Sequence, residues 1–234
     1  MLKVLKWFFY YLILELIILF LISYIYISSG NEISMFGEFV NNNRNYIVLL
    51  IGIIFIPIIY IKYKKINIKE NKTKNINILI FLGISLSLLY NVIGFYLDKI
   101  LNTNLYGVFD IKNTIISTVL IGPVIEEYLF RGIIYNEAKN KYNKAGLITT
   151  IIFAFSHTNF IQIIYAFILG YVLIKIYDKY NNIKYCILVH MFSNLVTTFI
   201  TLILIKNNIL INFLIFLIGF GILIFINKRK YDII

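Results

Sequence analysis

Charged residues are scarce in this sequence. They make up 14% of its 234 residues, whereas a soluble domain carries about a quarter. Hydrophobic residues make up 60%, and because so many apolar side chains have to face lipid, an ordinary soluble domain is excluded. The single cysteine, Cys186, excludes an internal disulfide, and we interpret it as a small apolar wall residue rather than a nucleophile.

Signatures of several protease classes are also missing. The sequence contains no GxSxG or similar serine motif and no HExxH helix. Its four aspartates are predicted to lie in loops or at the terminus, which argues against a membrane aspartyl pair: Asp98, Asp110, Asp178 and Asp232. Only two histidines are present, His157 and His190.

Eight apolar segments are long enough, or nearly so, to cross a bilayer, which takes about 20 residues with a range of roughly 17–25. They run approximately over 7–28, 46–61, 76–97, 114–135, 145–158, 160–176, 185–205 and 209–226. The first follows Lys3 and Lys6 and is too long for a signal-peptide core. The sequence therefore predicts an all-α polytopic membrane protein with eight transmembrane helices, forming a single integral membrane domain over 1–234.

The loop charges predict the orientation of these helices. If both termini are cytoplasmic, 18 of the 22 Lys and Arg residues fall in cytoplasmic segments. The other four, Arg44, Lys99, Lys112 and Lys206, fall outside. Positive charge concentrates on the cytoplasmic side of membrane proteins, so we expect both termini in the cytoplasm. The basic residues cluster between apolar runs, which indicates juxtamembrane anchoring and no nucleic-acid partner.

A few ionisable and amide side chains lie inside the apolar segments. Each charged group costs roughly 2.5–3.5 kcal/mol at a helix centre, so we expect these to be functional: Glu126, Glu127, Arg131, His157, His190 and Asn194. Residues four apart share a helix face, which pairs Glu127 with Arg131, Phe153 with His157, and His190 with Asn194. Glu126 faces elsewhere, and Gly122-Pro123 just before it is expected to kink the helix or start a half-helix.

These groups can activate water. A carboxylate partly removed from water is suited to accept a proton from a water molecule near neutral pH, a role we assign to Glu126 with His157 as its partner. His190 and Asn194 would then stabilise the oxyanion. By helical rise His157 lies roughly 20 Å from the cytoplasmic edge, so tilt or a hairpin that does not fully cross is needed to bring it closer.

Structural interpretations of the same residues stay open. Glu127 and Arg131 could equally form a structural ion pair, and His190 with Asn194 could join neighbouring helices. Phe153 is interpreted as packing, and Asn91 as an interhelical hydrogen-bonding residue. Glu15, in the first segment, has no partner four residues away and faces either a polar cavity or another helix.

The ordered set Glu126-Glu127-x-x-x-Arg131, Phe153-x-x-x-His157 and His190-x-x-x-Asn194 resembles the CAAX-protease and bacteriocin-processing (CPBP, or Abi) family of membrane endopeptidases. The resemblance covers a motif-bearing core over 114–205. It implies eight helices with a cavity open to the cytoplasm and a hydrolytic water activated by Glu126. Glu127 and Arg131 would support Glu126, while His157, His190 and Asn194 would complete the site.

The resemblance leaves the cofactor open. Glu126, His157 and His190 could hold Zn²⁺ with an open fourth position, whereas a glutamate-activated water needs no metal. We favour an enzyme without an obligatory metal.

The expected function is hydrolysis of a peptide or membrane-protein substrate near the cytoplasmic face, in peptide or bacteriocin processing or self-immunity. The expected location is a bacterial cell membrane. The alternative is a non-catalytic scaffold or immunity protein that binds a partner through the same cavity. A small transporter is disfavoured because the sequence contains no inverted repeat.

Overall fold

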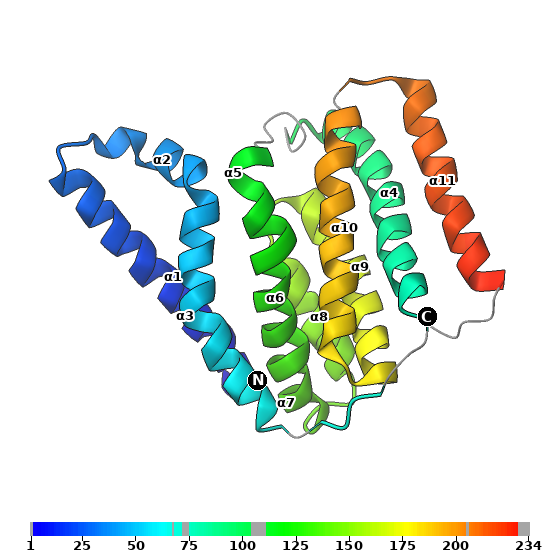
Figure 1. Cartoon of the computed structure of the whole chain (residues 1–234), viewed down its shortest axis with the longest axis horizontal. Coiled ribbons are helices and arrows are strands. Elements are labelled where there is room, and N and C mark those ends of the chain that lie inside the picture. The colour runs from blue at the N-terminus through cyan, green and yellow to red at the C-terminus, as the bar shows by residue number, and fades with distance from the viewer. Residues whose placement is uncertain (1, 67, 72–74, 104–110, 205, 229–234) are drawn as a thin grey trace. The chain divides into compact units, whose positions relative to one another are not determined.

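The computed structural model describes residues 2–66, 68–71, 75–103, 111–204 and 206–228 (Figure 1). Within these ranges every regular element is helical and no strand occurs, which confirms the all-α prediction. Several residues behind the charge and aspartate predictions lie outside the described ranges: Lys72, Lys74, Asp110, Arg229, Lys230 and Asp232. Contacts divide the chain into two compact units, each described by itself. Unit 1 is Met1–Asn67 with Ile111–Lys141, and unit 2 is Ile68–Asp110 with Tyr142–Ile234.

All eight predicted apolar segments coincide with helical stretches. Six helices are long and apolar enough to cross a membrane: α1 (Leu2–Ser28), α3 (Arg44–Lys64), α4 (Ile76–Leu101), α9 (Phe160–Tyr180), α10 (Ile183–Leu204) and α11 (Ile209–Lys228). The chain is therefore an integral membrane protein. An exact count of eight crossings and the cytoplasmic placement of both termini stay predictions.

Unit 1 is built around a helical run that changes type along its length. The run comprises α5 (Ile111–Ile115), η2 (Ile116–Ile121), α6 (Gly122–Glu127), η3 (Tyr128–Tyr135) and α7 (Asn136–Lys139), of which η2 and η3 are π-helical. The break expected at Gly122-Pro123 is thus a change of helix type and not an interruption. π-Helical turns inside α-helices are frequent at functional sites.

The other helices of unit 1 pack on this run. α3 contacts η2, α6 and η3, and α1 contacts α3 and η3. Aromatic pairs mark the contacts: Phe8 of α1 meets Phe130 of η3 with ring centroids 5.9 Å apart, and Tyr11 meets Phe55 of α3 at 5.2 Å. Two short helices absent from the sequence prediction, η1 (Ile33–Met35) and α2 (Phe36–Asn42), join α1 to α3.

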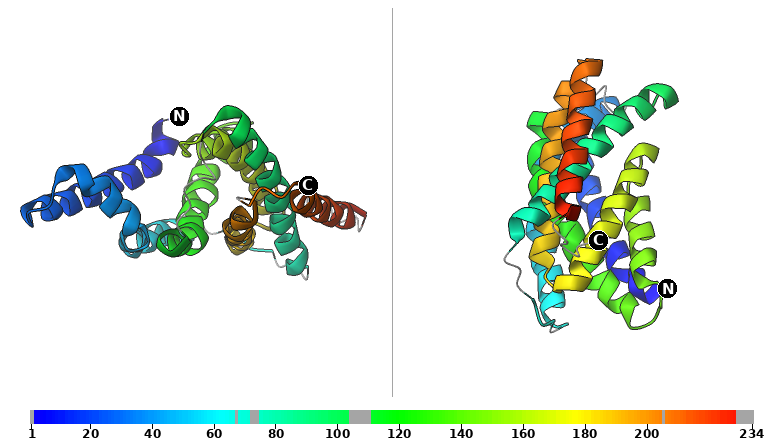
Figure 2. Two further views of the ribbon diagram at one scale, coloured as in Figure 1. Left: turned by 90° about the horizontal axis from the view of Figure 1, so that it is seen from above. Right: turned by 90° about the vertical axis from the view of Figure 1, so that its right-hand side faces the viewer.

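Unit 2 contains α4, α9, α10, α11 and the short helix α8 (Ala145–Phe155). α4 packs between α10 and α11, and α8 packs against α9; Figure 2 shows α11 beside α4 from two further directions. A buried cluster joins α4, α10 and α11: Leu88, Val92, Phe95, Leu204 and Ile215.

Two sequence predictions are corrected in unit 2. The predicted segment 145–158 is helical only to Phe155, so His157 lies in the turn beyond the helix. At 1.5 Å per residue α8 is about 16 Å long, too short to cross about 30 Å alone, which favours the hairpin that does not fully cross. Asp98 and Asp178 lie in the last turns of α4 and α9 rather than in loops, because both helices continue past their apolar stretches.

Candidate active site

Glu127 and Arg131 form an ion pair inside unit 1. The Arg131 Nη1 atom donates to Glu127 Oε1 at 2.8 Å, and both side chains are 0% exposed. The predicted i,i+4 pairing is therefore confirmed. Two buried charges are tolerated only when each neutralises the other at close range, so Glu127 is fixed by Arg131.

Glu126 has different surroundings from its neighbour Glu127. It is half-buried rather than fully enclosed, as expected for adjacent residues that point about 100° apart on a helix. Its Oε1 atom lies 3.8 Å from where a Cβ at Gly122 would stand, one turn earlier. Of the two residues, Glu126 is the less enclosed, although its Oε2 atom is itself buried.

The π-helical backbone around the carboxylates is supported by specific residues. The Gly122 N–H bonds the Ser117 carbonyl five residues earlier, and a Cβ at Gly122 would come within 2.8 Å of that oxygen. After the ion pair, the Asn136 side-chain amide donates to the carbonyls of Arg131 and Gly132 at 3.0 and 2.9 Å. Gly122 and Asn136 thus hold the backbone on either side of the carboxylates.

Glu15 lies on the inward stripe of α1. It is half-buried and shares that stripe with Tyr11 and the buried Ile18, whereas the opposite face of α1 is exposed and apolar. Glu15 is within electrostatic reach of Arg44 at the start of α3, and Tyr11 is within reach of Glu15 and Glu126. Glu15 was expected to face either a polar cavity or another helix. The structure favours the second alternative, with Glu15 facing α3.

The two histidines come together in unit 2 around Phe153. The buried Phe153 ring lies edge-on to His157 and to His190, with centroids 5.3 and 5.9 Å away. His190 is 3% exposed, and Asn194, one turn further along α10, is half-buried. Phe153 therefore has the packing role expected of it, and that role sets the spacing of the imidazoles.

The hydrogen bond of His157 indicates its tautomer. Its Nδ1 atom lies 3.1 Å from the Phe153 carbonyl oxygen. Because a carbonyl only accepts, Nδ1 carries the proton, and Nε2 of the neutral ring is then an acceptor. A neutral His157 can therefore orient a water molecule by accepting a hydrogen bond from it at Nε2, whereas donating to an oxyanion through Nε2 requires the protonated ring.

A glycine missed by the sequence prediction brings α4 against the histidine helix. A Cβ at Gly83 would lie 2.6 Å from the carbonyl oxygen of Val189, the residue before His190. Small residues allow such close approach between membrane helices. The signal in the sequence is the run of small residues at Gly83, Ser85 and Ser87.

A buried polar network supports the same stretch of α10. The Asn91 amide donates to Ser87 Oγ at 3.1 Å and to Thr197 Oγ1 at 3.0 Å. The Ser87 and Thr197 hydroxyl oxygens are themselves 2.8 Å apart. The predicted interhelical role of Asn91 is confirmed. Tyr165 of α9 hydrogen-bonds Ser193, which stands directly before Asn194. Sequence reasoning missed Tyr165 because its partner is 28 residues away.

The predicted site residues thus form two groups. Glu126, Glu127 and Arg131 lie in unit 1, and His157, His190 and Asn194 lie in unit 2. The convergence of the two groups stays a prediction. Over the residues that the structure describes, neither unit gathers three or more His, Cys, Asp or Glu side chains as a metal-binding set. Cys186 is buried, with Sγ 3.4 Å from the Leu173 carbonyl, consistent with a wall residue.

Comparison with known proteins gives a family match for part of the chain. Residues 111–196 match the family described as Rce1-like type II CAAX prenyl endopeptidase, which lies within the CPBP family. The matched range contains all six predicted site residues, and the resemblance read from the motifs is confirmed. No curated protein and no solved structure matches the chain.

Proposed function

We propose that this chain, a CPBP-family membrane protein by its residues 111–196, is an intramembrane endopeptidase with Glu126 as its general base. The matched family is a protease family, which supports a peptidase. The observation that carries the assignment is the contrast between the two adjacent carboxylates. Glu127 is enclosed and tied to Arg131 at 2.8 Å, while Glu126 beside it is only half-buried.

The proposed reaction uses the chain's own side chains. Glu126 takes a proton from water as the water oxygen bonds to the carbonyl carbon of the scissile peptide. The C–N bond then breaks, and the proton passes from Glu126 to the leaving nitrogen, which yields a carboxylic acid, whose hydroxyl keeps the second water proton, and an amine. General-base catalysis of this kind contributes typically 10²–10⁴-fold.

The site residues of unit 2 are proposed to act on the attacking water and on the carbonyl group of the scissile peptide. His157 Nε2, an acceptor when Nδ1 bonds the Phe153 carbonyl, would orient the attacking water. His190 and Asn194 would donate to the developing oxyanion, a contribution of about 2.7–4 kcal/mol per donor in other hydrolases. No step of this scheme passes through a metal.

The proposed substrate is a peptide or membrane protein cleaved near the cytoplasmic face of a bacterial cell membrane. Peptide or bacteriocin processing and self-immunity are the proposed settings. The buried Glu127–Arg131 pair is proposed to hold the helix that presents Glu126.

Comparative peptidomics of membranes tests the proposal. Cells producing wild-type protein are compared with cells producing Glu126→Gln, and Glu137→Gln is the matched control. Glu137 lies eleven residues after Glu126 on the same helical run and makes a partly exposed ion pair with Lys62 at 3.7 Å. We expect a set of peptides that wild type and Glu137→Gln produce and Glu126→Gln does not. An unchanged biological function in both Glu126→Gln and His190→Ala, at wild-type expression, would support the non-catalytic scaffold or immunity protein instead.

A further inference from the structure

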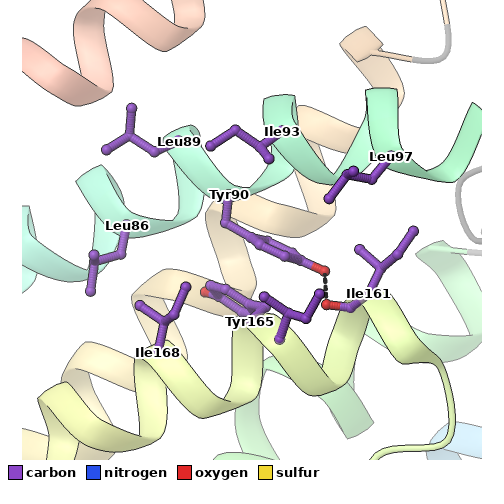
Figure 3. A pocket seen from close by; sticks show the side chains of 9 residues that line it. Leu86, Leu89, Tyr90, Ile93, Leu97, Ile161, Tyr165 and Ile168 are labelled. Atoms are coloured by element: carbon purple, nitrogen blue, oxygen red, sulfur yellow. Dashed lines mark hydrogen bonds between the residues drawn. The ribbon is translucent and has the colours of Figure 1, made fainter. Parts of the chain in front are cut away.

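A cavity of about 250 Å³ lies within unit 2 between α4 and α9 (Figure 3). Nine side chains line it, five from α4 and four from α9: Leu86, Leu89, Tyr90, Ile93, Leu97, Ile161, Ile164, Tyr165 and Ile168. None of these residues belongs to the predicted active site. The cavity therefore needs its own explanation.

The lining presents hydrocarbon and aromatic surface. Seven of the nine residues are Leu or Ile. The two tyrosine rings stack with centroids 4.0 Å apart, and both hydroxyls are already engaged. Tyr90 donates to the Ile161 carbonyl at 2.8 Å, as Figure 3 shows, and Tyr165 bonds Ser193 of α10. A ligand in this cavity is therefore recognised by apolar contact and not by hydrogen bonds.

The cavity opens to the outside of the helix pair. Ile93, Ile164 and Ile168 are 49%, 38% and 46% exposed, whereas Ile161 at its inner side is buried. Both α4 and α9 are long and apolar enough to span a membrane, so the medium outside their apolar surface is lipid hydrocarbon. The opening is therefore reached from the bilayer.

The dimensions suit a single chain of methylene groups. From Leu86 to Leu97 the lining follows α4 for about 16 Å of helical rise. A dry apolar cavity of about 150 Å³ already binds benzene, whereas a helix with its side chains is about 10–12 Å across and is too thick for this space. An unfilled cavity also forfeits dispersion contacts on its walls, which favours an occupant.

We propose that the α4–α9 cavity is a binding site for one acyl chain of a bilayer phospholipid. The acyl chain lies along α4 against the stacked Tyr90 and Tyr165 rings. The site is separate from the predicted catalytic residues, and the inference does not depend on the proposed function.

Photo-crosslinking of the full chain tests the site. The protein is reconstituted in vesicles of phosphatidylglycerol and phosphatidylethanolamine, with a trace of phosphatidylglycerol whose acyl chain carries a mid-chain diazirine. After illumination, labelling is compared between Ile93 in the cavity and Leu214 on α11, because both are 49% exposed. We expect several-fold more labelling at Ile93. Equal labelling of the two residues would overturn the proposal, since it would mean ordinary contact with bulk lipid.

A filling variant adds a second test. Ile164→Trp places a larger side chain in the cavity, and Ile224→Trp makes the same change on α11 at similar exposure, 41% against 38%. We expect Ile164→Trp to lower labelling of Ile93 to the level of Leu214, and Ile224→Trp to leave it unchanged. Undiminished labelling of Ile93 in a folded Ile164→Trp protein would also overturn the proposal. The wild-type comparison decides the question if that variant does not fold.

Discussion

Neutralising Glu127 should destabilise the protein far more than neutralising Glu137 on the same helical run. Glu127 and Arg131 are 0% exposed and 2.8 Å apart, so Glu127→Gln removes the carboxylate that pairs with the buried Arg131 guanidinium. Removing one partner of a buried pair costs about 3–5 kcal/mol. Glu137 and Lys62 are 20% and 33% exposed and 3.7 Å apart, and such surface pairs contribute about 0–1 kcal/mol.

Thermal unfolding of the purified proteins in detergent measures the difference. For a chain of this size each 1 kcal/mol shifts Tm by about 2–4 °C, so Glu127→Gln should lower Tm by roughly 6–20 °C. Glu137→Gln should lower it by no more than about 4 °C. Adding Arg131→Met to Glu127→Gln should restore part of the loss, because the uncompensated charge is removed. Equal Tm values for Glu127→Gln and Glu137→Gln would refute the reasoning that the buried pair holds this helix.

Three further outcomes follow from the structure. Gly83→Ala should destabilise the protein by about 1–3 kcal/mol, measured as a Tm shift, because its Cβ would lie 2.6 Å from the Val189 carbonyl; a neutral effect would mean that α4 and α10 are not in close contact. Tyr165→Phe should cost about 0.6–1.7 kcal/mol through the lost bond to Ser193, and unchanged unfolding would argue against the network. Chelation with EDTA should leave peptide cleavage intact under the metal-free proposal, and loss restored by zinc would favour a metal enzyme.

The elements of the fold could be predicted because each depends on local composition. Each predicted apolar stretch coincides with a helical stretch, and helical periodicity alone paired Glu127 with Arg131, since residues four apart share a face. The end of α8 at Phe155 was missed because the predicted segment was extended over the polar residues that follow it, Ser156, His157 and Thr158. Asp98 and Asp178 were misplaced for the opposite reason, since α4 and α9 extend into polar sequence.

The arrangement of the site was less accessible from the sequence. The π-helical turns on either side of Glu126 depend on close backbone packing at Gly122 and on the Asn136 amide, which no periodicity of apolar residues encodes. The Gly83 contact with Val189 and the Tyr165 bond to Ser193 join residues far apart in the chain. Such contacts are set by how helices pack, and small or hydroxyl-bearing residues in a membrane segment are their only local trace.

The central claim is that Glu126 activates the water that hydrolyses a peptide bond, and the fate of that water's oxygen tests it most directly. Membranes containing wild type, Glu126→Gln or Glu137→Gln are incubated in H₂¹⁸O, and new peptide C-termini are read by mass spectrometry. The account predicts ¹⁸O-labelled C-termini shared by wild type and Glu137→Gln and absent with Glu126→Gln. The same labelled C-termini at undiminished yield in folded Glu126→Gln would contradict it.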